Sequence, residues 1–217
     1  WATESVGLAG LLFVVFALAE MSGAQLGQAS LDLVRPGGEE GGGTLLDLEI
    51  GLADQRMLFW ILTLALVTRL PIVPLHFWLP AAHAASPTGL SILLVTGFAQ
   101  TAAVGLLRFA LPLFPEAALE ARTLLAGIGI AALGYASLVA LVQKEMNRLM
   151  AYLSVGYAGF AMFGIATMNV QGLTGAVVQL LTHGLATAAI FVLIGALAKR
   201  RGTTEVAAFG GLARPMP

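Results

Sequence analysis

The sequence contains no cysteine and only three histidines. Disulfide bonds and thiolate metal sites are therefore excluded. Charged residues make up 11% of the chain, whereas soluble domains carry roughly 25%. So few charges cannot cover a surface that faces water, and the mean hydropathy of +0.89 supports the same conclusion. We therefore expect the lipid bilayer to surround most of the chain.

The charge balance gives no reason to expect a nucleic-acid partner, because 11 basic residues are offset by 12 acidic ones. The sequence begins at Trp1 without a methionine and ends at Pro217, shortly after several basic residues. We therefore expect it to be a piece of a longer protein. The first apolar run is not preceded by basic residues and is followed by no cleavage site, so we expect no secretory signal here.

Six apolar segments are long enough, or nearly so, to cross a bilayer, which takes about 20 residues per helix. They comprise residues 5–21, 57–80, 88–111, 121–143, 148–168 and 173–199. The polar, glycine-rich stretch 22–55 is expected to be an extramembrane loop. The sequence thus predicts a single all-α, polytopic membrane domain with about six transmembrane helices.

The charges of the loops predict the orientation of these segments. The loop 22–55 holds six acidic residues and one arginine, whereas the turn 144–148 and the residues after 199 carry a basic excess. Basic loops are retained in the cytoplasm. We therefore expect loop 22–55 outside the cytoplasm and turn 144–148 inside it, which requires the first segment to run from inside to outside.

The segment 57–80 contains a charge where a membrane helix should be most apolar. Arg69 lies 12 residues into the segment, about 18 Å along a helix and so near the middle of the bilayer. Pro71 and Pro74 follow it, and each removes a backbone donor, so we expect the helix to break there. A charge beside a broken helix is typical of ion-translocating folds. The alternative is that Arg69 extends to the membrane interface and the prolines begin a re-entrant loop.

Two further segments place polar side chains at a similar depth. Gln100 lies in segment 88–111, and segment 173–199 carries Gln179, Thr182 and His183 at i, i+3 and i+4, which predicts one common face. A histidine can accept a proton on one nitrogen and donate from the other. Together with Arg69 these residues could form a lateral polar row. Gln100 could equally hold two helices together, and His183 could be a neutral structural residue.

No phosphate loop, nucleophile–base pair or metal-ligand cluster is visible in the sequence, so no catalytic residue is assigned. The run 69–89 reads RLPIVPLHFWLPAAHAASPTG and is similar to a lysine followed by PxxPxHxWLPDAH. Further runs match in order and spacing at 105–115, 143–160, 179–197 and 209–217. Over residues 56–217 the chain resembles the antiporter-like membrane subunits of NADH-quinone oxidoreductase (respiratory complex I), and the M-type chains most of all.

This resemblance implies part of a fold of inverted five-helix repeats with broken helices, in a bacterial inner membrane, where loop 22–55 would face the periplasm. It implies a proton-translocating subunit whose partners are the other membrane-arm subunits. NADH, flavin, iron–sulfur clusters and quinone would be bound by those partners and no redox cofactor by this chain. The alternatives are a subunit of a sodium/proton antiporter or of a membrane-bound hydrogenase, or a structural paralogue that does not pump.

The chain departs from the family pattern where the resemblance implies a proton path. Arg69 and Gln100 stand where the family has lysines, Asn147 replaces the lysine of the turn motif, and Tyr157 replaces a histidine. An arginine cannot in practice release its proton, and a glutamine carries no charge at all. The retained His183 is therefore the residue of the matched region that we expect to take up and release a proton.

Overall fold

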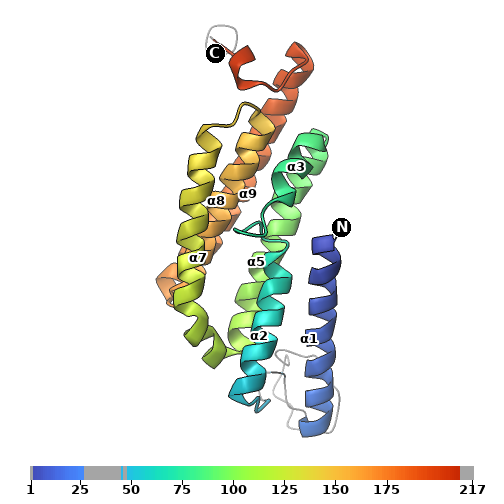
Figure 1. Ribbon diagram of the computed structural model, residues 1–217, viewed down its shortest axis with the longest axis vertical. Helices are drawn as coiled ribbons and strands as arrows, with labels where there is room; N and C mark the ends of the chain where they lie inside the picture. The colour runs from blue at the N-terminus through green and yellow to red at the C-terminus, as the bar shows by residue number, and fades with distance from the viewer. Residues whose placement is uncertain (1, 27–44, 46–47, 211–217) are drawn as a thin grey trace. The chain divides into compact units, whose positions relative to one another are not determined.

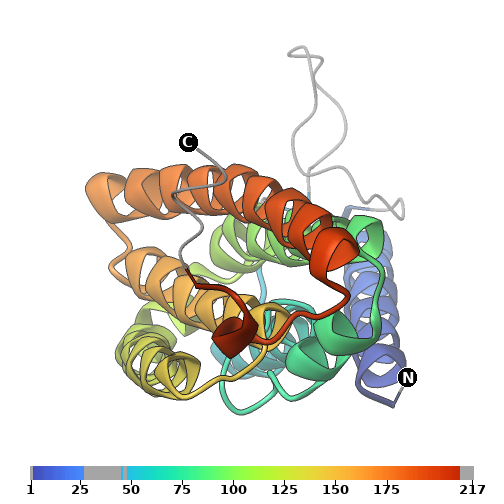
Figure 2. The ribbon, with the colours of Figure 1, turned by 90° about the horizontal axis from the view of Figure 1, so that it is seen from above.

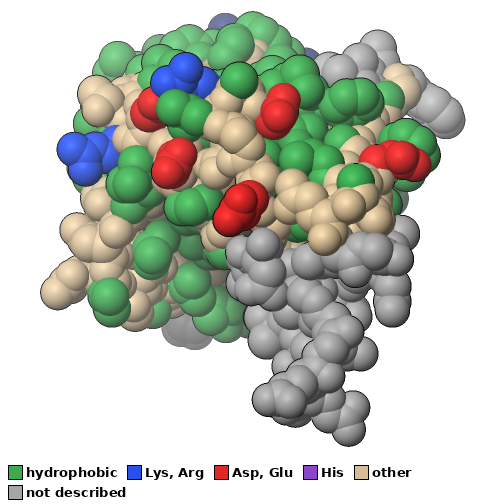
Figure 3. Space-filling model, turned by 90° about the horizontal axis from the view of Figure 1, so that it is seen from below, with side chains coloured by type: hydrophobic (Ala, Val, Ile, Leu, Met, Phe, Trp, Pro, Cys, Tyr) green, Lys and Arg blue, Asp and Glu red, His purple; other side chains and the backbone are tan. Residues whose placement is uncertain are grey.

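The computed structural model describes residues 2–26, 45 and 48–210, and this part of the chain is mostly helical, with no β-strand. It divides into two compact units. Unit 1 comprises Trp1–Arg69 and Ala102–Arg122, and unit 2 comprises Leu70–Thr101 and Thr123–Pro217. Acidic side chains, and some basic ones, lie scattered among hydrophobic side chains on the face shown in Figure 3.

Five helical spans within the described residues are long and apolar enough to cross a membrane: Gly7–Gln25, Thr88–Leu113, Pro115–Leu141, Met146–Ala166 and Val170–Arg201. The first span lies in α1 (Ala2–Leu26), and the last three are α7, α8 and α9. Each of these five overlaps one segment expected from the sequence. The sixth segment, 57–80, forms two shorter helices. The chain is therefore a polytopic α-helical membrane protein with one interrupted segment.

The start and end of the stretch 22–55 differ from the expected loop. Helix α1 continues to Leu26, and α2 (Leu52–Val67) has already begun before residue 55. The side-chain amide of Gln25 donates to the carbonyl of Glu49 and accepts from its backbone N–H, both at 3.0 Å. This reciprocal pair joins the last turn of α1 to the backbone just before α2. Residues 27–44 and 46–47 of the expected loop lie outside the described residues.

The interruption of segment 57–80 follows from its prolines. Helix α2 ends at Val67, and the next helix, α3 (Trp78–Ala85), begins eleven residues later. Between them the N–H of Arg69 donates to the carbonyl of Leu66 at 3.0 Å, and then the hydrogen-bond ladder stops. Pro71 and Pro74 have no N–H with which to continue the ladder. The expected broken helix is therefore present.

In unit 1, α1 runs alongside α2 (Figure 1). At the first residues of α2, Arg56 donates two hydrogen bonds of 2.6 Å to the carboxylate of Glu120 near the start of α7. Both side chains are about half exposed, at 52% and 48%. Exposed ion pairs contribute little to stability because water and salt screen them.

We therefore expect Glu120→Gln to lower the melting temperature of the assembled protein only slightly, and only at low ionic strength. At about 1 M salt, where the screening length is about 3 Å, the difference should vanish. The control is Glu116→Gln, which changes another exposed carboxylate on the same helix. A large loss that persists in high salt would show that the pair holds α2 and α7 together in a way that screening does not reach.

The membrane helix 88–113 is not a uniform α-helix. It consists of α4 (Thr88–Leu93), a π-helical turn Leu94–Phe98, α5 (Ala99–Gly105), a second π-helical turn Leu106–Ala110, and α6 (Leu111–Leu113). A π-helical turn contains one more residue than an α-helical turn and therefore rotates the side chains that follow it. Gln100 lies two residues after the first of these turns, so its direction depends on a local irregularity that the sequence did not predict.

In unit 2, α8 (Met146–Ala166) and α9 (Val170–Arg201) lie side by side, as Figure 2 shows. A short turn joins them, and the side chain of Asn169 accepts a hydrogen bond of 2.7 Å from the N–H of Gly172 at the start of α9. Helix α7 (Pro115–Leu141) approaches α8 closely at Gly129 and Gly159, where added Cβ atoms would lie 2.6–2.9 Å from atoms of the other helix.

Candidate functional site

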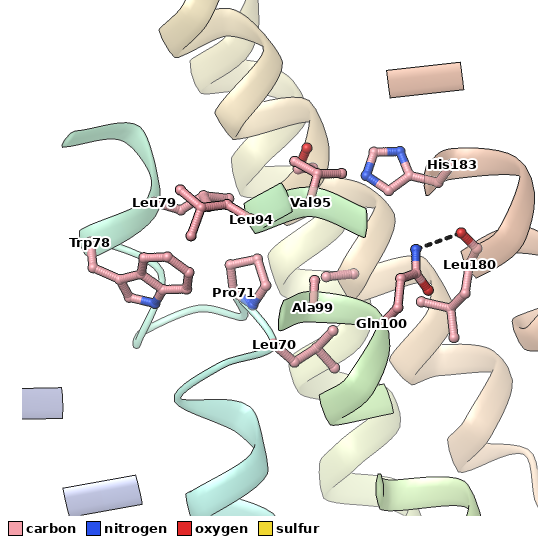
Figure 4. Close-up of a pocket in the computed structure, with 12 residues that line it drawn as sticks. Leu70, Pro71, Trp78, Leu79, Leu94, Val95, Ala99, Gln100, Leu180 and His183 are labelled. Atoms are coloured by element: carbon pink, nitrogen blue, oxygen red, sulfur yellow. Dashed lines mark hydrogen bonds between the residues drawn. The ribbon is translucent and has the colours of Figure 1, made fainter. Parts of the chain in front are cut away.

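Unit 2 contains a cavity between residues 70–79, the π-helical turn Leu94–Phe98, and helices α5, α8 and α9 (Figure 4). Its volume of about 10 Å³ is room for about one water molecule. Nine of its twelve lining residues are hydrophobic: Leu70, Pro71, Trp78, Leu79, Leu94, Val95, Ala99, Ala158 and Leu180. The three polar ones are Gln100, Ser154 and His183. Two residues expected to lie on a polar row therefore line one cavity.

Gln100 reaches from its own helix to α9. Its side-chain Nε2 donates a hydrogen bond of 2.7 Å to the backbone carbonyl of Leu180, drawn as the dashed line in Figure 4. The amide also lies against Gly184, one helical turn further along α9. This bond joins positions 80 residues apart in the sequence. The alternative expected for Gln100, a link between two helices, is thus observed.

His183 is the titratable residue of the cavity. It is 9% exposed, and its ring lies against that of Tyr157, with centroids 4.5 Å apart and planes inclined by 31°. Its Nδ1 lies 3.0 Å from the hydroxyl oxygen of Thr187, one turn later on α9. Thr187 can donate to this nitrogen or accept from it, according to the tautomer. Contacts on both sides thus hold the ring in place beside the cavity.

The prediction that Gln179, Thr182 and His183 share one face is only partly right. Thr182 is exposed, and its hydroxyl donates back to the carbonyls of Val178 at 2.9 Å and Gln179 at 3.1 Å. Gln179 is half-buried, and neither residue lines the cavity. Consecutive residues of an α-helix are about 100° apart, so a face centred on His183 directs Thr182 away from the protein interior.

The residues around the break are divided between the two units. Pro71 lines the cavity, whereas Pro74 is exposed and does not. Arg69 is half-buried and belongs to unit 1, directly before Leu70 in the chain. Of the residues expected in the row, Gln100 and His183 therefore share a cavity, Gln179 and Thr182 do not line it, and the membership of Arg69 stays a prediction.

Trp78 and Ser154 line the cavity but were not predicted to belong to a site. The hydroxyl of Ser154 donates to the carbonyl of Met150 at 3.0 Å and so satisfies itself within α8. Ser154 and Ala158 lie one turn apart, and their small side chains leave room for the cavity. The spacing of these two small residues in an apolar helix is the sequence signal that could have identified Ser154 as a cavity residue. No comparable signal marks Trp78.

The other two histidines are also buried in unit 2, at 1% exposure for His76 and 0% for His83. His76 lies near Tyr135 and Tyr152, with ring centroids 5.2 and 6.1 Å apart. His83 stacks on Phe191 at 4.8 Å. Neither lines the cavity. Among the described residues, no group of three or more metal-ligating side chains is brought together.

Relatives in sequence are subunits of a respiratory enzyme. NADH-quinone oxidoreductase subunit M of Pseudomonas aeruginosa is 43% identical over 174 residues, which cover 80% of this chain and 34% of the relative. The subunit of the same name from Rickettsia prowazekii is 38% identical over 168 residues, covering 77% and 34%. The chain thus spans about a third of the length of these curated relatives.

Solved structures and a protein family agree with these relatives. A chain of respiratory complex I from Thermus thermophilus is 27% identical with a TM-score of 0.81, covering 98% of this chain and 44% of that one. The Mrp complex from Dietzia sp. DQ12-45-1b matches with a TM-score of 0.78 at 23% identity, which shows the fold alone. The family described as "NADH:quinone oxidoreductase/Mrp antiporter, TM" matches residues 2–217. The chain therefore belongs to the NADH:quinone oxidoreductase/Mrp antiporter transmembrane family.

Proposed function

We propose that the chain is part of a proton-translocating membrane-arm subunit of an NADH-quinone oxidoreductase-like complex. The observation that carries this proposal is His183, a buried imidazole beside a small cavity next to an interrupted membrane helix. Buried ionisable groups are rare in membrane helices and are usually functional. The names of the relatives supply the reaction class, because they are subunits of NADH-quinone oxidoreductase.

The residues of the proposed proton path have different roles. His183 can take a proton on one ring nitrogen and release it from the other, with Thr187 as hydrogen-bond partner on the Nδ1 side. Gln100 can donate and accept hydrogen bonds but cannot carry charge. We assign Arg69, which precedes the cavity residues in the chain, the role of a fixed positive charge, because an arginine does not in practice release its proton. We assign electron transfer through NADH, flavin, iron–sulfur clusters and quinone to partner subunits, and no redox cofactor to this chain.

A second candidate function is a membrane-arm subunit that occupies its place without pumping. One observation favours it: Gln100 is neutral and already bonded to the carbonyl of Leu180. The two functions differ in a measurable ratio, the protons moved per quinone reduced by the complex in sealed vesicles. A ratio that depends on His183 supports pumping, and a ratio that does not depend on it supports the structural role.

The orientation of the chain is also part of the proposal, with loop 22–55 in the periplasm and turn 144–148 in the cytoplasm of a bacterial inner membrane. Gly51 is exposed at the start of α2 and has room for a Cβ atom, and Lys144 is exposed in the turn after α7. In intact cells we expect Gly51→Cys to react with an impermeant thiol reagent and Lys144→Cys to react only after lysis. The sequence itself contains no other cysteine that could react. The reverse pattern would overturn the orientation.

A further inference from the structure

The amide of Gln100 is seated on α9 at a position that only glycine leaves open. Its Nε2 donates to the carbonyl of Leu180 at 2.7 Å. A Cβ atom built on Gly184 would lie 3.0 Å from that Nε2 and 3.8 Å from the amide carbon. The first distance is shorter than ordinary van der Waals contact, so an alanine at this position would displace the amide by a few tenths of an ångström. Gly184 thus allows the amide to lie at its present distance from Leu180.

The cavity beside this contact is too small to hold the file of water molecules that proton transfer requires. A proton moves through a protein along a continuous file of hydrogen-bonded groups and water, and this cavity has room for about one water molecule. Its lining is mainly hydrophobic, and the Ser154 hydroxyl and the Gln100 Nε2 already have partners in carbonyls of α8 and α9. Narrow hydrophobic passages of this kind close by excluding water.

We propose that Gln100 and Gly184 form a neutral latch between the helix of Gln100 and α9, which keeps the cavity around His183 closed to a file of water until the amide leaves Leu180. This inference rests on the proposed proton-translocating function and adds a means of regulating the same site. A neutral hydrogen bond between membrane helices is weak enough to open and close reversibly. Gln100 thus controls the cavity through a hydrogen bond that requires no charge on its side chain.

Two substitutions release the latch in different ways. Gly184→Ala keeps the amide but displaces it, and the atom that must give way is the far end of a flexible side chain, so the fold of α9 should tolerate the change. Gln100→Ser removes the donor to Leu180 and leaves a small polar side chain in the lining of the cavity. The matched control is Gly175→Ala on the same helix, where an added Cβ would meet nothing within 4 Å.

The experiment measures passive proton permeability of vesicles that contain the complete complex, without NADH or quinone, after an imposed pH step. Gln100→Ser should raise the permeability about threefold, because a neutral interhelical hydrogen bond averages ~0.6 kcal/mol. Gly184→Ala should raise it by a smaller factor, because it displaces the amide without removing it. Gly175→Ala should leave it unchanged. The amount of assembled complex in each vesicle preparation normalises the rates.

Unchanged permeability in both latch variants would overturn the latch, as would an equal rise in Gly175→Ala. This failure is distinguishable from failure of the proposed function, which is judged by protons moved per quinone reduced. If that ratio depends on His183 while the latch variants show unchanged proton permeability, the latch is refuted and the proposed function stands. If the ratio does not depend on His183, the latch loses its basis too.

Discussion

Substituting His183 by glutamine or alanine should abolish proton transfer through this subunit and lower the number of protons moved per quinone reduced. His183 is the histidine that lines the cavity, and the polar residues that share the cavity with it, Gln100 and Ser154, cannot carry a proton as charge at neutral pH. Glutamine keeps a polar side chain of similar reach, whereas alanine also removes the contact with Tyr157. If both variants lower the number of protons moved per quinone reduced, the loss is due to the missing imidazole proton site rather than to the missing contact with Tyr157.

The measurement is proton uptake by sealed vesicles that contain the complete complex, normalised to the rate of quinone reduction. Thr182→Ala is a matched control, because Thr182 adjoins His183 in the sequence but is exposed and bonds only to carbonyls of its own helix. Arg69→Lys should also be tolerated, since both side chains supply a positive charge. A normal ratio in both His183 variants would contradict the pumping role and favour the structural one.

The break in the fold was predictable from the sequence because its cause is local. Pro71 and Pro74 remove backbone donors wherever they occur, and the structure ends α2 at Val67 accordingly. Hydrophobic length likewise identified the membrane helices, since the bilayer imposes the same requirement on each. That His183 is buried whereas Thr182 is exposed was not predictable, because periodicity gives the angle between two residues but not which side of the helix meets the protein.

The partner of Gln100 is a second feature that sequence reasoning missed. A backbone carbonyl has no sequence signature, and Leu180 is 80 residues away. The π-helical turn at Leu94–Phe98 also changes where Gln100 points, and no residue pattern in the sequence predicted it. The sequence therefore indicated candidate residues, of which Gln100 and His183 line the cavity, whereas the contact that restrains Gln100 became visible only with the three-dimensional arrangement.

The close approach of α7 to α8 leaves no room for a side chain at Gly159. An alanine Cβ at Gly159 would lie 2.6 Å from the carbonyl oxygen of Gly129 and 2.9 Å from the backbone nitrogen of Leu133. Backbone atoms of a packed helix cannot move aside as a flexible side chain can. Overpacking of this kind costs about 1–3 kcal/mol. We therefore expect Gly159→Ala to reduce the amount of assembled complex and lower its melting temperature.

The change in melting temperature should have the opposite sign when a nearby glycine of α7, Gly127, is replaced by alanine. A Cβ at Gly127 in α7 would meet nothing within 4 Å, and alanine is favoured over glycine in a helix by about 1 kcal/mol. Gly127→Ala should therefore leave assembly intact and raise the melting temperature slightly. Thermal unfolding of the purified complex, with both variants made in parallel, measures the two shifts. Equal shifts in the same direction would show that α7 and α8 do not meet closely at Gly129 and Gly159.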